Sequence, residues 1–202
     1  MKKMMMTLLM GVLAIASYAQ ARLDVHAGMS LANITNSDAN LKVGYTVGLG
    51  VDYPIDELWA FQTGVNITSK GCKDKMDGTS MKVNPVYLDI PFLAALKMDI
   101  CDGNKFVINA GPYLGIGLGG KITSELDGIE TSAKLFSKVG SNDESIMNRC
   151  ALGLQYGVGL ELADTYLVNL TGQYGFTNMI RKSFAGENNK NLAFLLTVGF
   201  RF

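Results

Sequence analysis

Three polar residues near the N-terminus have the side chains that a hydrolase uses. Asp24, His26 and Ser30 share one parity in a segment that alternates apolar and polar residues, so they would lie on one face of a strand. An acid, an imidazole and a hydroxyl activate a nucleophile only when they lie within hydrogen-bond reach. Side chains two residues apart on a strand project in parallel. We therefore predict that His26, the single histidine, is not catalytic and fills the interior of the fold.

Two further patterns resemble sites. The glycines of Gly115–Gly120 have the look of a phosphate-binding loop, but no helix pattern follows, and alternate glycines on one strand face explain them better. Cys72, Cys101 and Cys150 have no metal-ligand spacing. We predict no cofactor, no metal and no enzyme activity. The cysteines form either one bridge, between Cys72 and Cys150 at the same rim, or three free thiols.

Charged residues of the alternating segments lie on their polar faces. We predict that five of them and His26 form a polar network inside the fold: Asp24, His26, Asp52, Asp89, Glu161 and Arg201. Arg22 and Lys97 share these faces. Because a buried unpaired charge is costly, opposite charges should pair across the interior and fill it. Such an interior is not an open pore.

Eight segments alternate between an apolar and a polar face and therefore predict eight strands. They are residues 22–31, 42–53, 58–69, 83–97, 105–120, 149–162, 165–177 and 191–202. The first and the last would meet on closure, which makes Asp24 and Arg201 neighbours. The apolar face of the last segment ends in the aromatic Phe202.

The connections between these segments alternate in length. Long stretches precede every second segment, at residues 33–40, 70–82, 121–148 and 179–190, and the other connections are short turns. This regularity predicts an all-β fold, an eight-stranded antiparallel up-and-down transmembrane β-barrel with one decorated rim. Pro85, Pro91 and Pro112 lie inside strands, where each removes a ladder donor, so we expect bulges or bends there.

The polar faces indicate which side of the barrel meets lipid. They are dominated by glycine, with Thr, Asn and Gln, which suits a crowded interior. The outward aromatic residues also form two girdles of the kind found at membrane interfaces. The girdle near the short turns comprises Tyr53, Trp59, Phe106, Tyr166, Phe200 and Phe202. The girdle near the long loops comprises Tyr45, Tyr174 and Phe176. The alternative is a soluble lipocalin-like barrel whose apolar faces line a cavity for an apolar ligand.

The N-terminus has the features of a secretory signal peptide. Lys2 and Lys3 precede an apolar core that is too short to span a bilayer, and small residues follow. Cleavage after Ala19 and cleavage after Ala21 both fit this pattern. We prefer the first, which predicts a signal peptide at residues 1–19 and a barrel domain at residues 20–202. With 18 basic and 18 acidic residues, the 202-residue chain has no net field that favours nucleic acid as a partner.

The segment Tyr87-Leu88-Asp89-Ile90-Pro91 resembles the Tyr-Leu-Glu-Ile-Pro signature of the PorT-type outer-membrane β-barrel family, with Asp89 in place of glutamate. The strand order, the alternate long loops and the aromatic end extend the resemblance over the chain. It implies a place in the outer membrane of a Gram-negative bacterium. It also implies insertion by the barrel-assembly machinery, which recognises a closing strand with an aromatic end such as Phe202.

We therefore expect a small outer-membrane barrel, porin-like in architecture, with a structural, surface-contact or accessory role. Its expected partners are outer-membrane lipid, the barrel-assembly machinery and an unknown protein at the long loops, above all at residues 121–148. The alternatives are the soluble ligand-binding barrel and an outer-membrane lipid-modifying enzyme that depends on His26.

Overall fold

The protein is described here from a computed structural model. The structure describes residues 21–34, 40–76, 79–126, 129–136, 138–139, 144–145, 147–178 and 190–202. The predicted signal peptide lies outside the described residues, as do most of the predicted loops at residues 33–40 and 179–190. Among the described residues, no helix is long and apolar enough to cross a membrane.

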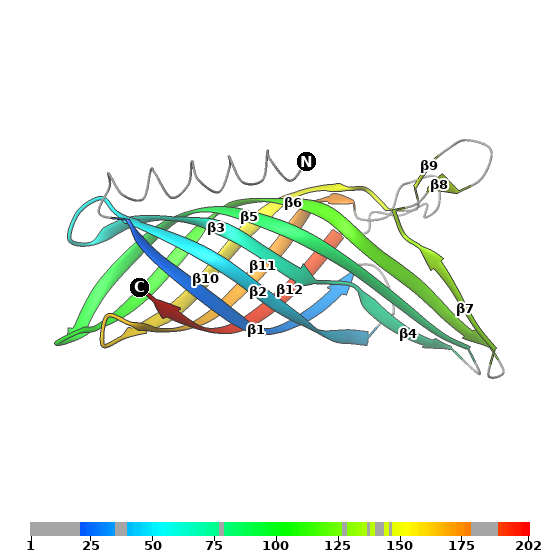
Figure 1. Ribbon diagram of the computed structural model, residues 1–202, viewed down its shortest axis with the longest axis horizontal. Helices are drawn as coiled ribbons and strands as arrows, with labels where there is room; N and C mark the ends of the chain where they lie inside the picture. Colours follow the sequence, from blue (N-terminus) through cyan, green and yellow to red (C-terminus); the bar gives the residue numbers. More distant parts are fainter. Residues whose placement is uncertain are drawn as a thin grey trace.

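Eight strands close into a ring (Figure 1). They are β1 (Arg22–Ile34), β2 (Asn40–Pro54), β3 (Trp59–Ser69), β5 (Thr79–Cys101), β6 (Asn104–Leu126), β10 (Cys150–Leu162), β11 (Tyr166–Asn178) and β12 (Lys190–Arg201). Every neighbouring pair is antiparallel, and β12 closes the ring against β1 with Arg201 opposite Asp24. Closure leaves the ring without a free edge. The predicted eight-stranded up-and-down barrel is confirmed.

Strands β5 and β6 continue far beyond the predicted bounds, and each has 23 residues. The prediction of loops at residues 70–82 and 121–148 is wrong where these strands run on. There, β4 (Cys72–Met76) pairs with β5 and β7 (Ile129–Lys134) pairs with β6. Beyond the membrane no lipid demands an apolar face, so these strands lack the alternation that identifies the others. Two short strands, β8 (Lys138–Val139) and β9 (Glu144–Ser145), form a separate pair.

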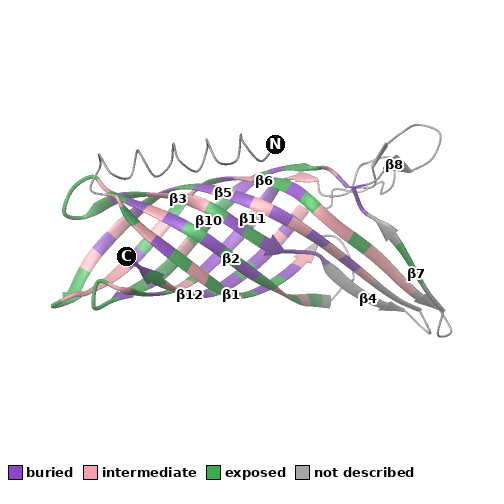
Figure 2. Ribbon diagram, in the orientation of Figure 1, coloured by how far each residue is buried: buried purple, intermediate pink, exposed green. Residues whose placement is uncertain are grey.

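The strands carry polar side chains inside, together with some small or apolar ones such as Ala95, Val107 and Leu195, and are apolar outside. Buried and exposed residues alternate along them (Figure 2). The buried set includes Thr46, Asn66 and Gln173, whereas Leu49 and Leu196 on the outer face are about half exposed. An apolar outer surface contradicts the soluble lipocalin-like alternative, which requires a polar one.

Both predicted aromatic girdles are present on the outer surface. Near the short turns, Tyr53, Trp59, Tyr166, Phe200 and Phe202 are exposed, and Tyr45 and Phe176 are exposed near the long loops. In the first girdle the rings of Tyr166 and Phe200 pack edge to face at 5.9 Å, as do those of Phe200 and Phe202 at 5.4 Å. Phe106 and Tyr174 are only partly exposed.

One of the three prolines predicted inside strands lies beside a bulge. The pairing of β5 with β6 shifts register between Val86 and Tyr87, next to Pro85. At Pro91 and Pro112 the expected bulges are absent, since the same register holds on both sides of each. Cys101 and Cys150 are exposed free thiols, so Cys150 forms no bridge with Cys72.

Candidate functional site in the barrel lumen

A balanced group of four charges fills the lumen near the short turns. Lys97 from β5 donates hydrogen bonds to Asp52 from β2 at 2.6 Å and to Glu161 from β10 at 2.7 Å. Arg201 from β12 donates two hydrogen bonds to Glu161, at 2.6 and 2.9 Å. All four side chains are buried. Two cations therefore neutralise two carboxylates and join four strands across the lumen.

His26 lies farther along the lumen and has oxygen partners on both ring nitrogens. Its Nδ1 is 2.8 Å from Oδ1 of Asp24, and its Nε2 is 2.7 Å from Oδ1 of Asn66. The prediction that strand neighbours two residues apart stay out of reach is wrong for Asp24 and His26, because the imidazole leans along the strand. The hydroxyl of Ser30 instead donates to the carbonyl of Ser69 at 2.6 Å. Asp24, His26 and Ser30 therefore do not form a nucleophilic triad.

A second charged group closes the lumen towards the long loops. The ammonium of Lys70 donates to Asp89 at 2.8 Å, and both side chains are fully buried. The same ammonium lies 4.8 Å from the ring centroid of Tyr113. Gln173 donates to Gln155 at 2.9 Å and approaches Asp89 at 3.5 Å. A cation, a carboxylate and two amides thus fill the second layer.

Sequence reasoning missed Lys70 because it was assigned to a loop. The signal was present, since Lys70 continues the inward parity of Asn66 and Thr68 on β3. Arg22, in contrast, was expected inside but is exposed. Its Nη1 lies 3.8 Å from Oδ1 of Asp164, which is in a short turn. The remaining predicted residues, Asp24, His26, Asp52, Asp89, Glu161 and Arg201, all have side chains in the lumen, distributed over the two layers and the space between them.

A small polar cavity of about 100 Å³ lies between the two layers. Its lining includes Asp24, His26, Asn66 and Asn109. This volume holds a few water molecules and is well below the roughly 300–1,000 Å³ of small-molecule sites. Among the described residues, no group of three or more His, Cys, Asp or Glu side chains is placed to hold a metal ion.

Glycine leaves room for these networks on the inner wall. A Cβ at Gly48 would overlap the Asn66 amide and lie against the His26 ring, and a Cβ at Gly50 would overlap the Asp24 carboxylate. The abundance of glycine on the polar faces therefore has a steric cause at these positions.

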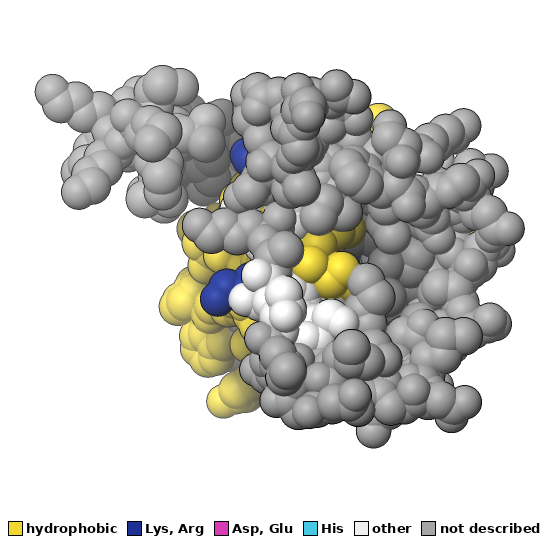
Figure 3. Space-filling view, turned by 90° about the vertical axis from the view of Figure 1, so that its right-hand side faces the viewer, with side chains coloured by type: hydrophobic (Ala, Val, Ile, Leu, Met, Phe, Trp, Pro, Cys, Tyr) yellow, Lys and Arg dark blue, Asp and Glu magenta, His cyan; other side chains and the backbone are white. Residues whose placement is uncertain are grey.

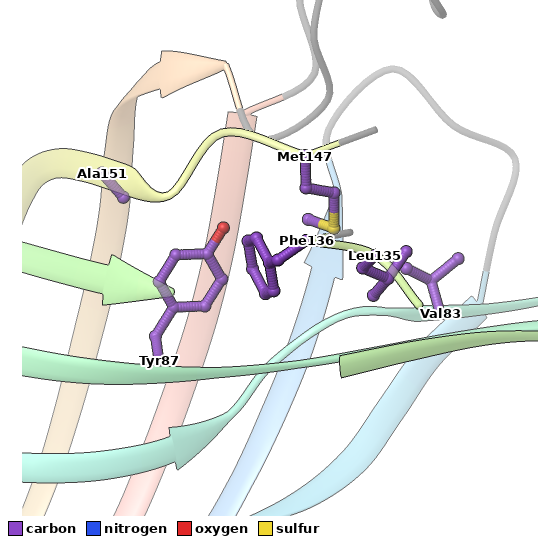
Figure 4. Close-up of a cluster of buried hydrophobic side chains, with 6 residues drawn as sticks. All are labelled: Val83, Tyr87, Leu135, Phe136, Met147 and Ala151. Atoms are coloured by element: carbon purple, nitrogen blue, oxygen red, sulfur yellow. The ribbon is translucent and has the colours of Figure 1, made fainter. Parts of the chain in front are cut away.

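An apolar plug closes the mouth of the barrel beside the long loops (Figure 4). Phe136 enters from the segment after β7 and packs edge to face on Tyr87, with ring centroids 5.8 Å apart. Leu135 and Met147 are almost fully buried beside it. Arg149 donates to the carbonyl of Phe136 at 3.0 Å, which ties the plug to the start of β10. Figure 3, which looks onto this end, shows hydrophobic side chains at its centre.

The closed ring, the apolar outer face and the charge-paired interior together define a transmembrane β-barrel of the bacterial outer membrane. Residues 16–181 match the family described as outer membrane protein beta-barrel domain, and the chain belongs to that family. No curated protein matches the chain by sequence.

Several solved outer-membrane proteins are similar to the chain in structure. The outer membrane enzyme PagL is 16% identical to the chain, with a TM-score of 0.51, and the alignment covers 87% of this chain and 97% of the PagL chain. Neisserial surface protein A is 15% identical, with a TM-score of 0.46, and its alignment covers 91% of this chain and 98% of the other. The attachment invasion locus protein Ail of Yersinia pestis is 13% identical, with a TM-score of 0.41, and its alignment covers 90% of this chain and 97% of the other. At these identities the likeness to PagL shows the fold alone.

Proposed function

We propose that this barrel has a structural and surface-contact role, executed by the strand extension at the long-loop end. The observation that carries the proposal is the length of β5 and β6, 23 residues each. At about 3.3 Å per residue and a tilt of about 40°, such strands rise about 55–60 Å along the membrane normal. A bilayer with its headgroups is about 40–45 Å thick. The extra length lies on the long-loop side of the membrane only, because the opposite ends of β5 and β6 are joined by a short turn.

The closed lumen supports this role over transport. In the described part of the chain, two layers of paired charges and an apolar plug fill the lumen, and the cavity between the layers measures about 100 Å³. Contacts with other molecules therefore fall to the outer surface and the extension. Loops and extensions on a rigid barrel are the parts that bind partners most freely.

A photo-crosslinking residue tests the proposal directly. Thr131 of β7 is exposed on the extension, Asp102 is exposed in a short turn and Leu196 is exposed on the lipid-facing wall. Introduced in place of Thr131 in living cells, the crosslinker should capture discrete protein adducts. The same group at Leu196 should capture lipid, and at Asp102 should not give the Thr131 adducts. Thr131 yielding no protein adduct, or the same adducts as Asp102, would count against a surface-contact role.

We propose further that the barrel is not an enzyme. The second ring nitrogen of His26 meets the Asn66 amide rather than a hydroxyl, and His26 faces the lumen rather than lipid. Replacing His26 by Gln should therefore leave the phosphate and acyl content of the outer-membrane glycolipid unchanged in cells that express the protein. A change in that content on replacement would favour the lipid-modifying alternative.

Three finer assignments belong to the same proposal. The Tyr87–Pro91 segment supports a relation to PorT-type barrels, since it differs from their Tyr-Leu-Glu-Ile-Pro signature only at Asp89. Strand β12 with Phe202, exposed beside Phe200, suits recognition by the barrel-assembly machinery. Cleavage after residue 19 would release a barrel domain that begins just before β1. Mass measurement of the protein from outer membranes would test the cleavage site.

A further inference from the structure

Four lysines are close in register where the extension leaves the barrel. Lys73 of β4 pairs directly with Lys82 of β5, and Lys121 of β6 pairs directly with Lys134 of β7. Lys82 lies opposite Thr123 and Asn84 opposite Lys121, so Lys82 and Lys121 are diagonal neighbours, about 7–8 Å apart. Like charges directly opposite one another destabilise a sheet. An anion bound at these positions would offset such repulsion.

The protein does not supply that anion to the two lysines whose side chains the structure describes. Within the described part of the chain, neither Lys82 nor Lys121 has an ion pair or a hydrogen bond from its side chain. Glu125 and Glu130, which share this parity, are register partners of each other farther toward the tip. Positive charge is thus nearer the membrane and negative charge farther from it.

The lysines begin where the lipid-facing surface ends. On β5, Lys82 has the parity of Val86, Leu88 and the exposed Phe92. Lys121 shares this outer face. Its register partner Asn84 has the same parity on β5 as Val86, which is paired with Gly119.

The height of these positions matches the lipid headgroups. Lys82 is four residues beyond Val86 and Lys121 is three beyond Leu118, which is half exposed on the outer wall. On tilted strands this is about 7–10 Å above the apolar band. The headgroup layer is about 5–7 Å thick on each side, and a lysine reaches down to it along its own stem.

We propose that Lys82 and Lys121 bind the phosphate groups of an anionic glycolipid in the outer leaflet. The lipid is favoured over an acidic protein because the lysines continue the lipid-facing wall and lie at headgroup height. Bound phosphates would offset the like-charge pairs and fix the extension relative to the membrane. This site lies at the base of the extension, nearer the membrane than Thr131, the position used to test protein contacts.

Lipid retention by the whole protein tests the site. The double variant Lys82→Gln/Lys121→Gln is compared with wild type and with Arg22→Gln/Lys105→Gln, which removes two cations near the short turns, where each lies by a carboxylate. Each protein is placed in phosphatidylcholine nanodiscs that contain bisphosphorylated or dephosphorylated lipid A. The lipid A retained on detergent extraction is counted by native mass spectrometry, after heat-dependent mobility confirms folding.

Wild type and the Arg22/Lys105 control should retain bisphosphorylated lipid A at least about tenfold better than the dephosphorylated form, and the Lys82/Lys121 variant should lose this preference. The expected size follows from about a fivefold gain per cation near an anionic membrane surface. Excess inorganic phosphate should leave retention by wild type unchanged. Equal retention by the Lys82/Lys121 variant overturns the site, and full displacement by inorganic phosphate overturns the assignment to a lipid.

Discussion

Lys97 holds two carboxylates that lie on different strands, Asp52 on β2 and Glu161 on β10. Its replacement by Met leaves Arg201 as the remaining cation of that group, so Asp52 keeps a hydrogen bond from Gln62 and the more distant Arg201 but loses its closest cation. We expect Lys97→Met to lower the free energy of unfolding by about 3–5 kcal/mol. Denaturant unfolding of the detergent-folded barrel, followed by the fluorescence of the single tryptophan Trp59, measures the change.

The matched control is Lys105→Met. Lys105 is also a strand lysine with a carboxylate partner, Asp99 at 3.3 Å, but that carboxylate is largely exposed. Its loss should cost less than about 1 kcal/mol. Adding Asp52→Asn to Lys97→Met should restore part of the stability, since it removes the charge that lost its closest cation. Equal effects of the two lysine replacements would contradict the role given to the buried charge.

His26 has a smaller structural role by the same reasoning. His26→Leu removes the partner of both Asp24 and Asn66, and each unsatisfied buried group costs about 1–3 kcal/mol. His26→Gln keeps an amide that can donate to Asp24, so we expect a smaller loss in the same unfolding measurement. A larger loss for Gln than for Leu would mean that the contacts of the ring, rather than its hydrogen bonds, stabilise this layer.

At the scale of elements, the plug is the part that connects the barrel to its extension. Phe136 packs on Tyr87 from β5, and a Cβ on Gly117 of β6 would overlap its ring. Phe136→Ala should therefore release the segment between β7 and β10 while the barrel stays folded. Limited proteolysis should then cut this segment faster, with heat-dependent mobility unchanged. Phe194→Ala, on the lipid-facing wall, is the control and should not change the cleavage rate. Unchanged cleavage in Phe136→Ala would show that the plug does not hold the segment.

The sequence allowed the barrel strands to be predicted because lipid on one side and a crowded lumen on the other impose period-two alternation. The same constraint placed Asp24 beside Arg201 at closure. This constraint does not act beyond the membrane, so the continuation of β5 and β6 lacks the period-two alternation that would have predicted it. Lys70 was missed at this boundary, and the convergence of Asp24 with His26 depends on a side-chain orientation that residue spacing does not specify. The plug could not be predicted either, since Phe136 contacts Tyr87 only after the chain has folded back into the mouth.

For the whole molecule, closure of the lumen depends on barriers in series. Lys97 belongs to the layer near the short turns, Lys70 to the second layer, and Phe136 to the plug above it. Wild-type protein in planar bilayers should therefore show no conductance of porin size, and neither Lys97→Met nor Phe136→Ala alone should open it, because each leaves another barrier intact. Ohmic channels of porin size in the wild type would contradict a filled lumen. Channels in Phe136→Ala alone would instead mean that the charged layers beneath the plug pass ions, and that the plug is the barrier.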